Sequence, residues 1–374
     1  MENSLSTPVL STYEAQQVDL TAIETELARF WWDAPESPEA SPPVTRACMA
    51  NLVIFCRSTA EEREIVQEIP LIVAQHPSRV LLLVADANNQ SEQLEAFVSA
   101  HCRLIEEGQQ LCSEQVTVRA GSAGIRRLPS LVRSLLLGDL ATSLWWATPE
   151  APPLRGTLFE ELVELADQII YDSVAWTDPI RQLMVTANWI GRGQTKSIAD
   201  LAWRRPMLWH RLLAQTLEPS YAPGALQGIS EIHIEHGPHA LTQAWLLIGW
   251  LALRLGWTPR GGRVTPGPEV HWQFAWSHGS PQVRIRRLTS GEAEIKILRI
   301  VTRVAGNPVT FHFRAESASR VSAFAEGFAE RTLSLSSPVL SRAEMVARQL
   351  PDLAHDRLFE ESVALARTMA EAVL

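Results

Sequence analysis

Gly121 and Gly124 are the first residues whose type and spacing point to chemistry, because they follow a predicted strand and precede a predicted helix. Such a turn presents backbone N–H groups to a phosphate at the helix N-terminus. The turn lacks the third glycine of the dinucleotide fingerprint and the Lys-Ser/Thr pair of a P-loop. We therefore interpret it as a tight strand-to-helix turn.

Asp172 and Ser173 follow a predicted central strand, at the edge where open α/β sheets bind ligands. A serine nucleophile needs a base and a glycine-rich elbow, and the residues around Ser173 supply neither. We interpret the pair as a strand-end turn or a helix cap. The alternative for Gly121 and Asp172 together is an uncharacterised α/β enzyme or binding protein that acts on a phosphorylated metabolite.

His233, His236 and His239 are spaced by three, which on a helix would give a metal-binding face. Gly237 breaks any helix here, and Ile232 alternates with the histidines as in a strand. The sequence therefore favours a surface strand and loop. No metal, cofactor or catalytic residue is predicted, and the scaffold resembles that of an enzyme without recognisable catalytic parts.

The four cysteines are Cys48, Cys56, Cys102 and Cys112, and none belongs to a zinc pattern. Cys48 and Cys56 flank one predicted strand and would be roughly 26 Å apart, whereas a disulfide needs Cα atoms within about 7 Å. They cannot pair if the strand is straight. We interpret the cysteines mainly as small buried residues in a reducing compartment, and a pairing of Cys102 with Cys112 stays open.

Composition restricts the class of protein. The chain has 374 residues and a formal net charge of −9, without a concentrated basic run. Nucleic-acid binding is not expected, because phosphate contacts need clustered Lys and Arg. The polar first twenty residues predict no secretory signal, and hence a cytoplasmic protein. The apolar stretch 240–257 contains Gln243 and Arg254, so we expect a buried amphipathic helix rather than a membrane span.

Strands alternate with helices over residues 48–175, which predicts a doubly wound, mainly parallel sheet. The stretch 140–173 is its clearest unit, a strand, turn, helix and strand. A helix is expected over 93–103. We assign 44–222 to this Rossmann-like domain without a complete nucleotide fingerprint, and 1–43 to a loose N-terminal arm, a helix over 19–32 and a linker.

Residues 223–374 predict a second, α+β domain, which begins near a proline- and glycine-rich break at 218–228. Its strand candidates are 229–235, 270–276, 282–288, 294–302 and 309–315. Turn residues join the later strands, so we expect an antiparallel sheet.

Trp31 and Trp32 are neighbours on the predicted N-terminal helix. Adjacent helix residues cannot both face inward. One of the two should be available to a partner, and aromatic residues are common at the centres of protein interfaces.

Several segments together resemble the OpcA family, the glucose-6-phosphate dehydrogenase assembly or effector proteins of cyanobacteria and actinobacteria. The order of these segments along the chain carries the resemblance. They are His-Pro-Ser-Arg at 76–79, Leu-Trp-Trp at 144–146, Leu-Ala-Asp at 165–167, Asp-Ser at 172–173, Asp-Leu-Ala-Trp-Arg at 200–204, Trp-His-Arg-Leu-Leu at 209–213 and the apolar run 246–257.

The resemblance implies a non-catalytic allosteric activator of the cyanobacterial type. It implies binding to glucose-6-phosphate dehydrogenase, promotion of its active oligomer, and support of the oxidative pentose phosphate pathway in carbohydrate metabolism. It also implies redox regulation through thioredoxin, for which Cys102 and Cys112 are the candidate cysteines. The family has no defined catalytic motif, so no residue here inherits a catalytic role.

Overall fold

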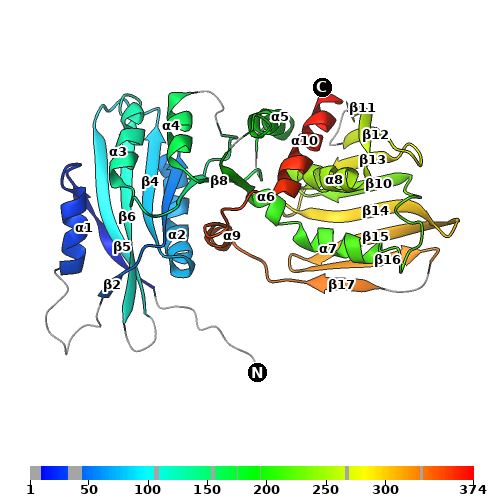
Figure 1. The fold of residues 1–374 in the computed structure, drawn as a ribbon, viewed down its shortest axis with the longest axis horizontal. Helices are drawn as coiled ribbons and strands as arrows, with labels where there is room; N and C mark the ends of the chain where they lie inside the picture. The colour runs from blue at the N-terminus through cyan, green and yellow to red at the C-terminus, as the bar shows by residue number, and fades with distance from the viewer. Residues whose placement is uncertain are drawn as a thin grey trace.

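The computed structural model describes residues 10–32, 44–104, 109–152, 156–174, 176–193, 195–265, 269–328 and 332–374. Within them the chain forms two β-sheets that lie side by side, with helices against and between them (Figure 1). The first sheet is mainly parallel and the second mainly antiparallel. The predicted fold class is confirmed.

The first sheet, sheet A, comes from the N-terminal part of the chain. Its strands are β1 (Leu10–Val18), β2 (Val44–Arg46), β3 (Ala50–Cys56), β4 (Ser78–Asp86), β5 (Leu94–Leu104), β6 (Gln110–Gly121), β7 (Thr142–Trp146), β8 (Gln168–Tyr171) and β9 (Ser197–Asp200). Strands β6-β4-β3-β7-β8-β9 are parallel neighbours in this order, which is that of dinucleotide-binding doubly wound sheets. β2 pairs with β6, and β5 and β1 extend the sheet antiparallel beyond β6.

Helices cover both faces of sheet A. They are α1 (Ile23–Trp32), α2 (Thr59–Gln75), η2 (Ile125–Arg127, a short 3-10 helix), α3 (Leu128–Leu135), α4 (Thr157–Leu165) and, from the far end of the chain, α9 (Arg342–Gln349). Leu52 and Trp145 pack with α2 and α9, whereas Val53 and Trp146 pack with α3 and α4. Trp146 also stacks on Phe55, with ring centroids 4.1 Å apart. The continuous apolar runs therefore mark strands buried on both faces, as expected.

Two predictions for this part are wrong. The helix expected over 93–103 is strand β5, whose small residues alternate toward the core, with Ala96, Val98 and Ala100 almost fully buried. The residues expected in a loose arm include strand β1, which pairs antiparallel with β5. At β5 pairing with neighbouring strands overrides local helix propensity, and at β1 pairing with β5 orders a polar segment that was expected to be loose. The linker predicted around 34–43 lies outside the described residues.

The second sheet, sheet B, comes from the C-terminal part. Its strands are β10 (Glu231–His236), β11 (Thr258–Thr265), β12 (Glu269–Ala275), β13 (Gln282–Arg287), β14 (Ile295–Val304), β15 (Asn307–Ser317), β16 (Arg320–Glu326) and β17 (Leu333–Ser336). The remaining helices are α5 (Pro179–Ile190), α6 (Leu201–Arg204), α7 (Met207–Thr216), α8 (Leu241–Leu255) and α10 (Arg357–Glu371). The expected strands are present, but β10 pairs parallel with β13 on one side and antiparallel with β14 on the other, so the sheet is not a simple meander.

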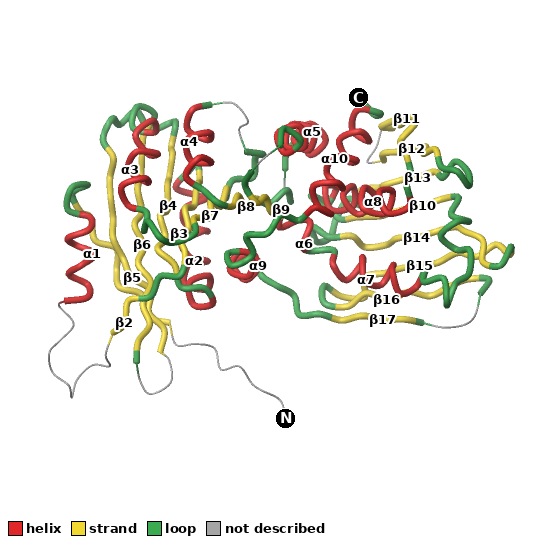
Figure 2. Tube along the Cα trace, in the orientation of Figure 1, coloured by secondary structure: helices red, strands yellow, loops and turns green. Residues whose placement is uncertain are grey.

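One face of sheet B is apolar and packs against helices, whereas the other carries polar residues. Ile232, Ile285 and Phe313 are fully or almost fully buried on the inner face, and α8 contacts β10 and β13 there (Figure 2). Alternation along β10 and β13, and along β14 from Leu298 onward, places the intervening polar residues on the outer face.

Helix α8 occupies most of the apolar stretch 240–257, and ten of its 15 residues are buried. It packs against α10, and Gly249 permits the close contact because a Cβ there would lie 2.9 Å from the carbonyl oxygen of Ser362. The prediction of a buried helix is confirmed. No helix in the described ranges has the length and apolar character needed to cross a membrane.

The C-terminal segment returns from sheet B to sheet A. Helix α9 packs against α2, and Arg342 of α9 forms an ion pair with Glu68 of α2 at 2.5 Å. Helix α10 packs against both α5 and α8. The last two helices thus join the two sheets; the division at residues 222 and 223 stays a prediction.

Candidate functional site

In a doubly wound sheet the ligand crevice lies where the strand order reverses, which here is between β3 and β7. The turn after β3 contains no glycine among residues 56–59. Ser58 caps α2 and accepts a hydrogen bond from the Glu61 backbone N–H at 3.2 Å. The Glu61 carboxylate in turn accepts from the Arg57 backbone N–H at 2.7 Å. The chain's own side chains therefore use N–H groups that a pyrophosphate would need.

Charge at this crevice also opposes a dinucleotide. Glu61 and Glu62 lie in the first turn of α2, where the helix dipole would otherwise attract a phosphate. Arg57 forms an ion pair with Glu150, which follows β7, and this pair spans the switch point. The crevice does not fit the pyrophosphate of a nicotinamide cofactor.

Gly121 ends β6, which is third in chain order among the six parallel strands β3, β4, β6, β7, β8 and β9, whereas a dinucleotide-binding turn follows the first of them, β3. A Cβ on Gly121 would lie 2.4 Å from the carbonyl oxygen of Ser91 and 2.6 Å from that of Asn89. The glycine is needed for close packing of the loop between β4 and β5. This supports the interpretation as a tight turn.

Asp172 and Ser173 belong to a polar network at the end of β8. Asp172 forms a bidentate pair with Arg205, with both N–O distances 2.7 Å. Ser173 donates its hydroxyl to Asp200 at 2.6 Å and its backbone N–H to the same carboxylate at 3.0 Å. Asp200 also caps α6 by accepting from the Ala202 N–H. Ser173 is thus held by a carboxylate and has no histidine base among its hydrogen-bond partners.

Asp200 is the most perturbed carboxyl of this network, and sequence reasoning missed it. Burial, followed by the nearby Asp172 carboxylate, raises its pKa to about 7 despite the hydrogen bonds from Ser173 and Ala202. The sequence Asp200-Leu201 is compatible with an aspartate at the start of a helix. The burial of the Asp200 side chain, however, depends on the packing of β9, the edge strand of sheet A, and could not be predicted from the sequence.

The three histidines do not form a metal site. His233 lies on the outer face of β10, and His236 is fully buried with Nδ1 2.7 Å from the carbonyl oxygen of Gly237. His239 is in the turn before α8, with φ 65°. In the part of the chain that the structure describes, no group of three or more His, Cys, Asp or Glu residues is arranged to hold a metal ion.

Cys102 and Cys112 form a disulfide between β5 and β6, where they are direct partners in the antiparallel register. Both are fully buried. Cys48 and Cys56 are free, as the geometry of their strand required. Burial and the nearby Glu61 and Glu62 raise the pKa of Cys56 to about 12, so its thiol stays protonated and unreactive at neutral pH.

Trp31 and Trp32 are the last two residues of α1, and their side chains lie outside the described part of the structure.

The structure also contains a hollow of about 900 Å³ beside α7, which no pattern in the sequence predicted. Met207, Val339 and Arg348 are among its lining residues, and come from segments distant in the sequence.

Comparison with models of known protein families shows to which family this chain belongs. Residues 70–188 match the family model described as the glucose-6-phosphate dehydrogenase subunit N-terminal domain, and residues 196–363 match that of the C-terminal domain. Both models are those of OpcA. The chain belongs to the OpcA family. The resemblance seen in the sequence is therefore confirmed.

Curated members of the OpcA family are similar over about half of this chain. The putative OxPP cycle protein OpcA of Synechocystis is 34% identical over 206 residues, which are 54% of this chain and 42% of the relative. The proteins of the same description from Nostoc punctiforme and Synechococcus elongatus are each 31% identical, over 50% and 53% of this chain and 40% and 44% of theirs. The chain thus spans less than half the length of each.

Among solved structures, an NAD binding oxidoreductase from Klebsiella pneumoniae has a TM-score of 0.50 at 10% identity, over 87% of this chain and 96% of that one. At this identity the likeness shows the fold alone. It agrees with a doubly wound sheet followed by a second, open sheet.

Proposed function

We propose that this protein is a non-catalytic effector that binds glucose-6-phosphate dehydrogenase, favours its active oligomer and so supports the oxidative pentose phosphate pathway. Membership of the OpcA family carries the proposal. The switch-point crevice supports it, because Ser58, Glu61 and the Arg57–Glu150 pair use the place where an oxidoreductase of this fold would hold its dinucleotide. We place the protein in the cytoplasm as part of the same proposal.

An effector shifts an enzyme's equilibrium only by binding the active form more tightly than the inactive form. A tenfold shift requires about 1.4 kcal/mol of differential binding. A few well-placed interface side chains are enough for that.

The first prediction is a mixing experiment with purified cyanobacterial glucose-6-phosphate dehydrogenase. Adding the intact protein should raise dehydrogenase turnover saturably, by on the order of tenfold for about 1.4 kcal/mol of differential binding, and should shift the enzyme toward larger oligomers in analytical ultracentrifugation. The protein alone should show no NADP-dependent turnover. Turnover by the protein alone, or an unchanged dehydrogenase rate at saturating protein, would contradict the proposal.

A second prediction concerns Trp31 and Trp32, which we propose as part of the interface. The net charge of −9 disfavours long-range attraction to another acidic protein, so we expect an apolar and aromatic interface with weak salt dependence. The Trp31→Ala/Trp32→Ala variant should lose most of the activation across a salt series. Phe324→Ala, an exposed aromatic on sheet B, is the control and should activate normally. Normal activation by a folded double variant would remove α1 from the interface.

A third prediction tests redox control through Cys102 and Cys112, with thioredoxin as the proposed reductant. The buried sulfurs need opening of the β5–β6 pair before a thiolate can attack, so reduction should be slow in the native protein. Dehydrogenase activation should differ between oxidised and reduced protein, and this difference should vanish in Cys102→Ser/Cys112→Ser. That variant should also lose about 3 kcal/mol of stability. The matched control is Cys48→Ser/Cys56→Ser; if it abolishes the redox difference and the first variant does not, the assignment is wrong.

A further inference from the structure

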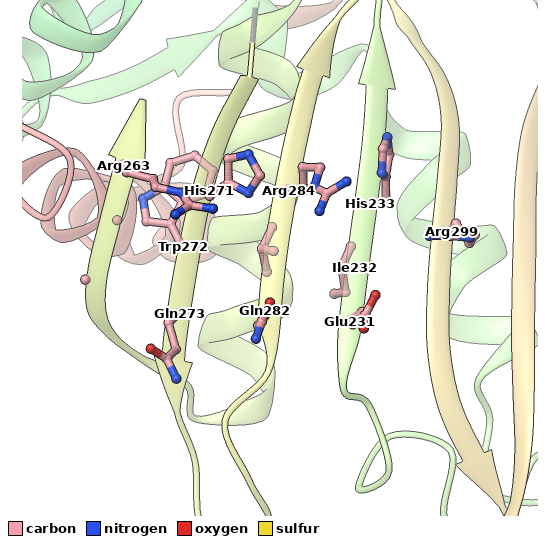
Figure 3. Close-up of a pocket in the computed structure, with 13 residues that line it drawn as sticks. Glu231, Ile232, His233, Arg263, His271, Trp272, Gln273, Gln282, Arg284 and Arg299 are labelled. Carbon is pink, nitrogen blue, oxygen red and sulfur yellow. The ribbon is translucent and has the colours of Figure 1, made fainter. Parts of the chain in front are cut away.

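Five side chains form one row across the outer face of sheet B, which we call the basic row. Arg263 is opposite His271, His271 is opposite Arg284, Arg284 is beside His233, and His233 is opposite Arg299 in the strand register. Figure 3 shows the five side chains following one another across neighbouring strands. Arginine and histidine alternate along the row, although each comes from a different strand.

The arginines of the basic row have no carboxylate partner. In the described residues none of the three forms an ion pair, whereas Arg286, two residues along β13 from Arg284, pairs with Glu235. Successive arginines of the row are two strands apart, which places their backbones about 10 Å from each other. Like charges at this spacing on an exposed sheet face repel one another weakly, because solvent and salt screen them. An anion between them would relieve the repulsion.

The basic row lines a hollow of about 430 Å³ on the sheet. Small-molecule sites have volumes of about 300–1,000 Å³. Glu231 is the single carboxylate among its lining residues, against three arginines and two histidines. At one rim Gly261 of β11 leaves open space, since a Cβ there would have no neighbour within 4 Å. The hollow is therefore concave, open and cationic.

The alternation along the row gives two equivalent positions for an anionic group. Arg284 and Arg299 flank His233, and Arg263 and Arg284 flank His271. Guanidinium groups bind phosphate through two parallel N–H donors, and the imidazole can supply a further N–H. Each position thus offers two forked guanidinium donors to a phosphate group, and the two positions share Arg284.

Two carboxylates touch the histidines of the basic row from one side. Glu235 lies 3.4 Å from His233 Nε2 and Glu269 lies 3.1 Å from His271 Nε2. An anion on the row is therefore held mainly by the three arginines, which form no ion pair in the described residues and outnumber these two carboxylates. We propose that the basic row binds a small phosphorylated metabolite, with one phosphate over His233 and a second anionic group over His271.

The test is isothermal titration calorimetry of the full chain with fructose 1,6-bisphosphate, fructose 6-phosphate, inorganic phosphate and fructose. The bisphosphate should bind saturably and about tenfold more tightly than the monophosphate, and fructose should not bind. Arg284→Gln and Arg299→Gln should each weaken bisphosphate binding at least tenfold. Arg314→Gln removes the same charge from the same face outside the hollow, and should change the affinity less than twofold.

Three results would overturn the proposal. They are absence of saturable binding to any phosphate compound, equal losses in Arg284→Gln and Arg314→Gln, and inorganic phosphate binding as tightly as the esters, which would assign the row to free phosphate. If Arg284→Gln abolished dehydrogenase activation while the unmodified protein bound no phosphate, the row would be a protein interface instead. Because the titration contains no dehydrogenase, its failure is distinguishable from failure of the proposed effector role. Urea unfolding of each variant confirms that it is folded.

Discussion

Replacing Arg79 with methionine is expected to lower the free energy of unfolding by about 2–3 kcal/mol, because the buried Glu114 then keeps Arg46, at 2.6 Å, as its one remaining ion-pair partner in the described residues. Arg79 is 2% exposed and donates to Glu114, which is 0% exposed, at 2.5 Å. It also donates to Glu24 of α1 at 2.6 Å and to the carbonyl oxygen of Leu135 at 2.7 Å. One guanidinium therefore ties α1 and α3 to the centre of sheet A.

Urea unfolding of Arg79→Met measures this loss. The matched control is Arg57→Met, because the Arg57–Glu150 pair is 49% and 53% exposed and should contribute no more than about 1 kcal/mol. Adding Glu114→Gln to Arg79→Met should recover part of the stability, since the half-exposed Arg46 then no longer has to compensate a buried carboxylate alone. A loss in Arg79→Met no larger than in Arg57→Met would contradict the assigned role.

Asp200 is expected to make the free energy of unfolding strongly dependent on pH. Its pKa is raised to about 7 in the folded protein, mainly by burial, and is near 3.8 when exposed. Between these values the folded state holds a proton that the unfolded state has released, so the free energy of unfolding falls as the pH rises from 4 to 7. The full penalty, on the order of 4 kcal/mol, applies above pH 7.

Asp200→Asn removes this penalty and keeps the geometry, because the amide oxygen still accepts from Ser173 and Ala202 and the amide N–H can donate to the Ser173 hydroxyl. The variant should match the unmodified protein near pH 3, exceed its stability increasingly as the pH rises to about 7, and keep a constant excess above that. Asp172→Asn, which breaks the partly exposed pair with Arg205, also removes the second cause of the raised Asp200 pKa and should give a weaker form of this profile. A stability difference constant with pH would show that Asp200 does not titrate on unfolding.

The local pattern of apolar residues was sufficient to predict the strands that are buried on both faces, such as those around Val53 and Trp145. It failed for β5, because leucine, glutamate and alanine favour a helix and only pairing with β6 makes the segment a strand. The family was recognisable from ordered segments of sequence. The basic row was not, because Arg263, Arg284 and Arg299 become neighbours only through sheet register.

The return of α9 to sheet A has a consequence for synthesis on the ribosome. Arg342 and Glu68 are 274 residues apart, and Met345, Val346 and Leu350 complete the core on the α2 side of the sheet. The ribosome adds about 5–20 residues per second, so α9 is synthesised on the order of tens of seconds after α2. During this time the apolar side of α2 that α9 later buries stays exposed. Nascent chains should therefore recruit chaperones throughout translation of sheet B, and a codon change that slows translation there should lower the yield of folded protein without altering a single residue.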